Sequence, residues 1–157
     1  MEKEIEIYLD LSKNKLFGFQ DGVDTLAVAI MCEGIIQGCE FPAVDVVRGT
    51  KGYKMLCEEW LELDNFGIEN YGGHHRAVAH YIEGAKLRVR IYEGHFFKKR
   101  LWPFSLIDSP KIPINKISIV DDYYPKRARD ALINLPRDVV ERFCRENNLD
   151  INNYLSQ

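Results

Sequence analysis

The sequence predicts an α+β fold, with a small mixed sheet and flanking helices followed by a C-terminal helical segment. Two stretches, residues 4–11 and 86–94, alternate polar and apolar side chains, which is typical of strands with one buried face. Between and after them, apolar residues recur at spacings of three and four, which is typical of helices. With 157 residues, 46% of them hydrophobic, the chain is long enough to form one domain with its own core.

Composition excludes several classes of protein. The net charge of −3 argues against a generally basic nucleic-acid binder, so a phosphate-bearing partner has to meet a local basic patch. No apolar run approaches the roughly 20 residues that a membrane span needs. The acidic, alternating start MEKEIEIYLD is unlike a secretory signal, and the four cysteines form no C-x-x-C pair, so we expect a cytoplasmic protein with free thiols.

The first half of the chain predicts strand, turn, helix and strand in that order. Residues 4–11 form the first strand, and the stretch from Gly18 to Gly22 has turn chemistry. Apolar residues from Val23 onward then follow helical spacing, with Gly34 as the expected stop. The β-branched stretch 41–47 predicts a strand with a proline near its beginning.

The middle of the chain predicts a strand that leads into a helix. Residues 53–63 fit either a helix or a strand, and residues 66–70 form a short strand. The next helix starts at His74, and Gly84 is its expected C-cap. The expected apolar stripe of this helix consists of Val78, Tyr81, Ile82 and Ala85.

Residues 86–94 form the clearest strand, with apolar residues on one face and basic residues on the other. From residue 86 to residue 100 there are six Lys or Arg residues and one acidic residue, Glu93, with aromatic residues interleaved. Basic charge with stacking side chains suits a nucleic-acid backbone or single strand, although solvated charge on a half-buried strand is the simpler interpretation. The candidate nucleic-acid-binding residues are Arg88, Arg90, Lys98, Lys99 and Arg100.

The last third of the chain is expected to be helical. Helical spacing covers residues 125–135 and, after Pro136, residues 137–147. We therefore divide the chain into a mixed α/β domain at 1–108 and a C-terminal helical extension of the same compact unit at 109–157.

The stretch GGHHR, residues 72–76, is the main candidate site. Helix starts usually attract acidic or hydroxyl side chains, because free N–H groups and the helix dipole create positive potential there. Here an arginine and two histidines occupy that position. A bound anion resolves the conflict, since glycines let backbone N–H groups approach a phosphate and arginine can bind it in a fork. A structural turn with solvated side chains is the alternative. The candidate phosphate-binding residues are Gly72, Gly73, His74, His75 and Arg76.

Metal binding and cysteine chemistry are weaker interpretations. His75 and His80 are about 140° apart around a helix, and the adjacent His74 and His75 diverge, so no metal is expected on these histidines alone. No cysteine lies near them in sequence with a local activating context.

The pattern resembles the ParB/sulfiredoxin superfamily, including ParB-like nuclease domains. The similarity covers residues 21–92: a helix followed by "GI", the stretch FPAVDVV, a short strand, and GGHHRAVAHYIEGAKLRVRI. Known members include CTP-binding chromosome-partition proteins, ATP-using sulfiredoxins, ADP-using archaeal free-serine kinases and proteins described as ParB-like nucleases. The resemblance implies a ParB/sulfiredoxin-like fold in which residues matching Gly73, His74, His75 and Arg76 hold nucleotide phosphates.

This sequence also departs from those relatives. His74 stands where sulfiredoxins have their catalytic cysteine, so reductase chemistry is not expected. Gly72 stands where the kinases have an aspartate, which weakens a kinase assignment. The helices after Pro125 carry acidic residues that argue against a strong DNA-recognition helix.

The expected function is therefore a nucleotide-phosphate-binding ParB-like domain in a DNA-associated role such as partition, regulation or nuclease-like activity. The expected cofactor is CTP or ATP/ADP, with Mg²⁺ left open. The expected partners are the nucleotide and DNA, with a homodimer left open and no membrane. One alternative is an ATP/ADP-dependent small-molecule kinase with Asp21 or Glu69 as general base. A second alternative is a metal-dependent nuclease that uses His74, His75 and nearby acidic residues. A third is a non-catalytic interaction module in which the GGHHR stretch is vestigial.

Overall fold

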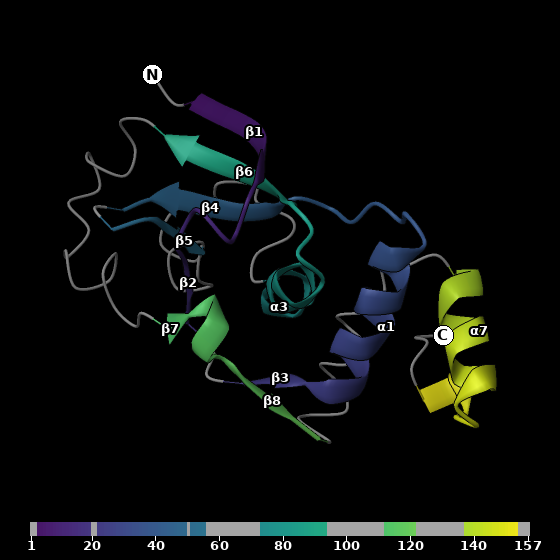
Figure 1. Ribbon diagram of the computed structural model, residues 1–157. Helices are drawn as coiled ribbons and strands as arrows, with labels where there is room; N and C mark the ends of the chain where they lie inside the picture. The colour runs from purple at the N-terminus through teal and green to yellow at the C-terminus, as the bar shows by residue number, and fades with distance from the viewer. Residues whose placement is uncertain are drawn as a thin grey trace.

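The computed structural model describes residues 3–19, 22–49, 51–55, 73–93, 112–121 and 137–153, and in them the chain has an α+β fold (Figure 1). A mixed six-stranded sheet has the order β1-β6-β4-β5-β2-β7, and β3 and β8 form a separate parallel pair. The strands are β1 (Lys3–Leu9), β2 (Leu16–Gly18), β3 (Gly22–Asp24), β4 (Val44–Arg48), β5 (Tyr53–Met55), β6 (Leu87–Glu93), β7 (Ile112–Pro113) and β8 (Ser118–Val120). The helices are α1 (Thr25–Ile36), α3 (His74–Glu83) and α7 (Arg137–Glu146), with short 3₁₀ turns η1 (Ile114–Lys116) and η2 (Ile151–Asn153).

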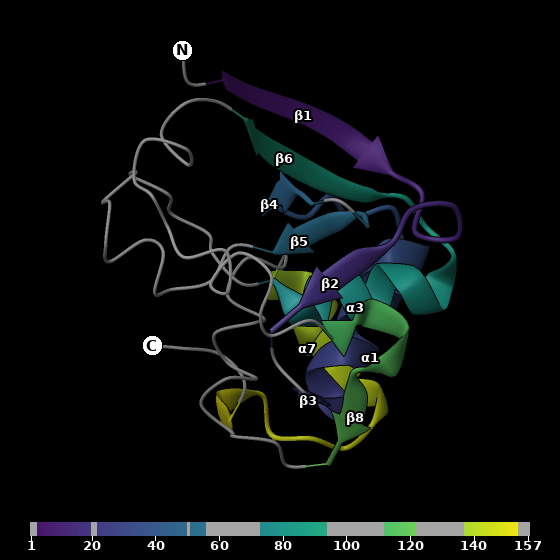
Figure 2. The same ribbon diagram turned by 90° about the vertical axis from the view of Figure 1, so that its left-hand side faces the viewer.

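Strand β6 lies in the interior of the larger sheet, between β1 and β4 (Figure 2). It runs antiparallel to β1 and parallel to β4. Its alternation predicts the faces correctly, because Leu87, Val89 and Ile91 are fully buried while Arg88 and Arg90 lie on the other face. A strand that is paired on both sides and buried on one face is expected to show a clean alternating pattern in the sequence.

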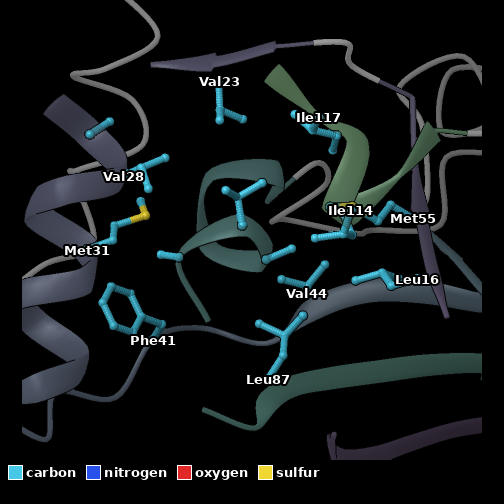
Figure 3. Close-up of a cluster of buried hydrophobic side chains, with 14 of the residues drawn as sticks. Leu16, Val23, Val28, Met31, Phe41, Val44, Met55, Leu87, Ile114 and Ile117 are labelled. Carbon is cyan, nitrogen blue, oxygen red and sulfur yellow. The ribbon is translucent and has the colours of Figure 1, made fainter. Parts of the chain in front are cut away.

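Helix α3 is the central element of the molecule. Seen end-on in Figure 1, it lies between the six-stranded sheet and the β3–β8 pair, with α1 at its side. Figure 3 shows the apolar side chains around it, including Val28 from α1, Val44 from β4 and Ile114 from η1. All seven residues from His74 to His80 are buried, so this helix has no solvent-exposed face over its first two turns.

The apolar stripe expected on α3 is therefore partly wrong. Val78 is buried, but Tyr81 is 43% exposed and Ile82 is 48% exposed. The prediction assumed that the helix buries one face along its whole length. In the structure, the first two turns are buried on all sides and the last turn lies at the surface. Polar residues at the start of α3 consequently lie in the interior.

Helix α1 begins and ends later than expected. Val23 belongs to β3, and Asp24 caps the helix by accepting a hydrogen bond from the Ala27 N–H at 3.0 Å. Gly34 lies buried inside the helix rather than at its end. The left-handed glycine that follows the helix is Gly38, with φ of 80°.

The segment after residue 109 is not only helical. Ile112–Pro113 forms β7, which pairs with β2, and Ser118–Val120 forms β8, which pairs with β3. The expected turn at Gly18–Gly22 likewise lies between strands β2 and β3, which include its two end residues. Two- and three-residue strands escape pattern analysis because they are too short to show alternation.

Several other expected boundaries shift by a few residues or fall outside the described ranges. The first strand spans Lys3–Leu9, the strand expected at 41–47 spans Val44–Arg48, and Tyr53–Met55 is a strand. The expected helix at 137–147 is confirmed as α7, which packs on α1 through a buried face that includes Val140 and Cys144. The strand expected at 66–70 and the helix expected at 125–135 lie outside the described residues.

Candidate functional site

The start of α3 is formed by Gly73, which adopts a left-handed conformation with φ of 89°. No side chain caps this end of the helix, and its first turn contains no acidic residue. Helix starts carry partial positive charge and N–H groups without intrahelical acceptors. The unusual charge pattern in the sequence therefore corresponds to a real helix start.

The His74 side chain lies in the core, where it is 1% exposed. Its Nε2 accepts a hydrogen bond from the Phe19 N–H at 3.0 Å, and the Phe19 ring packs edge-on against it with centroids 4.4 Å apart. Because Nε2 accepts, the ring is neutral with its proton on Nδ1. A Cβ on Gly18 would lie 2.6 Å from His74 Cδ2, so glycine is needed there for the imidazole to fit.

His75 joins the starts of two helices. Its Nε2 accepts a hydrogen bond from the backbone N–H of Asp24 at 3.0 Å. Asp24 is the N-cap of α1, so the beginning of α1 and the beginning of α3 are held side by side. The structure thus uses His75 as a neutral acceptor in the interior, where it is 7% exposed.

Arg76 connects α3 to the segment before β4. Its Nη1 donates to the carbonyl oxygens of Pro42 and Ala43 at 2.6 and 3.2 Å. Its Nη2 lies beside Gly73, 2.9 Å from where a Cβ would stand. Although Arg76 is not part of the apolar stripe expected for this helix, it is buried and only 8% exposed.

The charge environment of Arg76 is mixed. Burial lowers the pKa of the guanidinium, and the nearby carboxylate of Asp45 acts in the opposite direction. Asp45 itself is 1% exposed. Arginine stays charged in proteins, so the start of α3 combines a helix terminus with a buried cation.

The basic residues of β6 lie elsewhere, on the face of the sheet away from α3. Arg88 pairs with Glu6 of β1 at 2.5 Å, and this carboxylate raises the pKa of Arg88. Arg90 lies 3.7 Å from Glu6 and 3.9 Å from Asp45. Both candidate arginines of β6 therefore have acidic partners. Arg90 and Arg76 share Asp45 as an acidic neighbour, whereas Arg88 pairs with Glu6.

The remaining candidate residues lie outside the described part of the chain. These are Gly72, Lys98, Lys99 and Arg100, together with the general-base candidates Asp21 and Glu69. Among the residues that are described, no group of three or more His, Cys, Asp or Glu side chains is arranged to hold a metal ion. Burial and Glu83 raise the pKa of Cys32 to about 11, which keeps this thiol protonated.

Sequence reasoning missed the partners of the GGHHR side chains. Those partners are backbone groups of Phe19, Asp24, Pro42 and Ala43. Backbone groups leave no residue-type signal, so a pattern search cannot find them. The one available signal was Asp24-Thr25 before a helical run, which is typical of an N-cap.

Comparisons with known proteins add little. No protein-family model and no curated protein matches the chain. In structure it is similar to protein Atu1540 from Agrobacterium tumefaciens, with 18% identity and a TM-score of 0.45 over 98% of this chain and 84% of that one. Within the described residues, no helix is both long and apolar enough to cross a bilayer.

Proposed function

We propose that this chain is a nucleotide-phosphate-binding domain of the ParB-like type, acting in a DNA-associated role, with the phosphates held at the start of α3. One observation carries the proposal. The guanidinium of Arg76 is fixed through Nη1, while Nη2 lies against left-handed Gly73 and makes no hydrogen bond within the described ranges. The N–H groups of Nη2 are therefore hydrogen-bond donors positioned beside the start of α3.

The chemistry of this arrangement suits an anion. Arginine binds phosphate oxygens through several N–H donors, and helix starts bind phosphates through backbone N–H groups. A bound phosphate would also offset the buried positive charge of Arg76. In this proposal Gly72 and Gly73 permit close backbone approach, and Arg76 contacts the phosphate.

The two histidines take a different role from the one expected. His74 and His75 use Nε2 to accept backbone hydrogen bonds, so they position the start of α3 against β2 and α1. In the proposal they hold the phosphate-binding backbone in place. The nucleotide proposed is CTP or ATP/ADP, with Mg²⁺ left open.

The same hydrogen bonds favour a second candidate, a non-catalytic interaction module in which the GGHHR stretch is purely structural. Burial of all three side chains is what such a module would show. No observation in the described residues favours the kinase alternative, whose candidate general bases Asp21 and Glu69 lie outside them. Thermal shift measurements distinguish the first two candidates.

The experiment compares thermal shifts with ATP, ADP, CTP and GTP, with and without Mg²⁺, for three proteins. The wild type is measured beside Arg76→Lys, which keeps the charge but loses the forked geometry. Arg88→Lys is the matched control, because it makes the same substitution on the other face of the sheet. A ligand at 100 times its dissociation constant stabilises the native state by about 2.7 kcal/mol.

We expect one nucleotide to raise the melting temperature of the wild type and of Arg88→Lys, and the shift to be lost in Arg76→Lys. If no nucleotide shifts any of the three proteins, the phosphate proposal is wrong and the structural module remains. A shift of equal size in Arg76→Lys would exclude Arg76 as the phosphate contact.

A further inference from the structure

A second feature lies at the opposite end of α3 from Gly73. A cavity of about 160 Å³ opens between the end of α1, the segment before β4, the end of α3 and the start of β6. Its apolar lining comes from Ile35, Phe41, Pro42, Ala85 and Leu87. Exposed Glu40 and Lys86 also line it, so the cavity reaches the surface. The lining includes Pro42, whose carbonyl oxygen accepts from Arg76, so the cavity lies on the other side of the segment that holds this arginine.

His80 is the polar side chain buried in the wall of this cavity. The residue is 8% exposed, and its ring packs edge-on against Phe41 with centroids 5.4 Å apart. Nδ1 lies 2.7 Å from the Arg76 carbonyl oxygen, which can only accept, so Nδ1 carries the proton. The lone pair is then on Nε2, which has no hydrogen-bond partner within the described ranges.

The surroundings keep this imidazole neutral. Burial lowers the pKa of His80, and the positive charge of Arg76 lowers it further. The hydrogen bond to the Arg76 carbonyl acts in the opposite direction and raises this pKa. At neutral pH His80 therefore offers a buried hydrogen-bond acceptor beside the apolar lining, while the polar lining residues Tyr8, Glu40, Lys86 and Arg88 are exposed or half-buried. Such a site selects ligands that place one donor next to an apolar body.

The volume limits the size of that body. A cavity of about 150 Å³ lined by Leu, Ile and Phe side chains holds one benzene ring. The cavity beside His80 is of this size, and Ile35, Phe41 and Leu87 form the apolar part of its lining. We propose that it binds a small hydroxyaromatic molecule, whose ring packs on Phe41 and Leu87 and whose hydroxyl donates to Nε2 of His80.

The test uses phenol as the probe and anisole as its matched control. The two share the ring, but anisole lacks the O–H donor. The intact protein is labelled with ¹⁵N, and long-range ¹H–¹⁵N spectra report the ring nitrogens of its four histidines. We expect phenol to shift Nε2 of His80 in a saturable way, and to bind roughly threefold to tenfold more tightly than anisole.

Two variants locate the site. His80→Phe keeps an aromatic ring beside Phe41 but removes the acceptor, so the preference for phenol over anisole should disappear. Ala85→Met fills the cavity from a half-buried position and should abolish binding of both compounds. Ala29→Met, at a half-buried position of α1 outside the lining, is the control that should bind phenol as the wild type does. If His80→Phe does not fold, Ala85→Met still tests the site.

Three results would overturn the proposal. The first is an unmoved His80 signal in folded protein at saturating phenol. The second is equal binding of phenol and anisole, or unchanged phenol binding in Ala85→Met. The third is tighter binding of N-acetyltyrosinamide than of phenol, because that result would assign the cavity to a tyrosine side chain of a partner protein.

Discussion

Buried polar side chains at the start of α3 each satisfy backbone groups of another segment. His74 accepts from Phe19, His75 accepts from Asp24, and Arg76 donates to Pro42 and Ala43. A buried backbone group that loses its partner costs about 1–3 kcal/mol. These residues therefore determine how three separate segments are placed around α3, whether or not a ligand also binds there.

Gly18→Ala tests the contact with His74. The new Cβ would lie 2.6 Å from Cδ2 and 2.7 Å from Nε2 of a fully buried ring. We expect a decrease of about 1–3 kcal/mol in the free energy of unfolding, measured by urea denaturation. Gly49→Ala is the control, because its Cβ would meet the flexible end of Lys54 and should cost less. Equal decreases in the two variants would contradict this account of Gly18.

His80 makes stability depend on pH. Its folded pKa is lowered from 6.5, first by burial, so the unfolded chain takes up the proton more readily. The stability from neutral His80 is complete above pH 6.5 and is lost as the pH falls below 6.5 toward the folded pKa. We expect urea midpoints measured from about pH 8 to about pH 5 to fall less steeply for His80→Phe than for the wild type. Parallel curves would exclude His80 as a source of the acid sensitivity.

At the scale of elements, α1 and α3 begin side by side because Asp24 makes a hydrogen bond with each of them. Its carboxylate caps α1, and its backbone N–H donates to His75 of α3. The sheet places β6 beside β1, so that basic residues on one strand face Glu6 on the other. Ion pairs that are partly exposed, as these are, contribute little to stability.

Asp24→Ala tests the cap. Removal of the side-chain acceptor leaves the Ala27 N–H without its partner and should reduce the free energy of unfolding by about 1–2 kcal/mol. Asp24→Asn keeps an acceptor oxygen and should cost clearly less, because asparagine caps helices about as well as aspartate. Urea midpoints of the two variants give the comparison. If both variants are destabilised equally, the negative charge matters more than the hydrogen bond.

At the scale of the whole molecule, the proposed DNA-associated role depends on where positive charge is available. The chain carries a net charge of −3, and the arginines of β6 are paired with Glu6 and Asp45. Charges that are already paired contribute less to binding a phosphate backbone. We therefore expect residues 98–100, rather than Arg88 and Arg90, to provide the main DNA contacts of this chain.

Fluorescence anisotropy with duplex and single-stranded DNA over a range of salt concentrations tests this expectation. Replacing Lys98, Lys99 and Arg100 with alanine should reduce the salt slope by about 0.9 for each duplex phosphate that the variant no longer neutralises. The double variant Arg88→Ala/Arg90→Ala is the control and should have a smaller effect. Wild-type protein that binds no DNA even at low salt would contradict the DNA-associated role.

The local pattern of the sequence determined the elements that are long and regular. The alternation in β6, the spacing in α7 and the helix start at His74 were all predicted, since each depends on residues close together in the chain. The same pattern could not predict strands β2, β7 and β8, because two or three residues carry no period. It also placed Gly34 at the end of α1, because a glycine buried in a helix and a glycine after a helix look alike in sequence.

For the candidate site, the sequence by itself determined that a helix begins directly after two glycines and that His74, His75 and Arg76 occupy its first turn. Only the tertiary structure decided what those side chains do. It surrounds α3 with two sheets and a second helix, so both imidazoles turn inward to backbone N–H groups and Arg76 turns to backbone carbonyls. The physical reason is that a buried polar side chain has to find a hydrogen-bond partner, and the available partners came from segments more than 30 residues away along the chain.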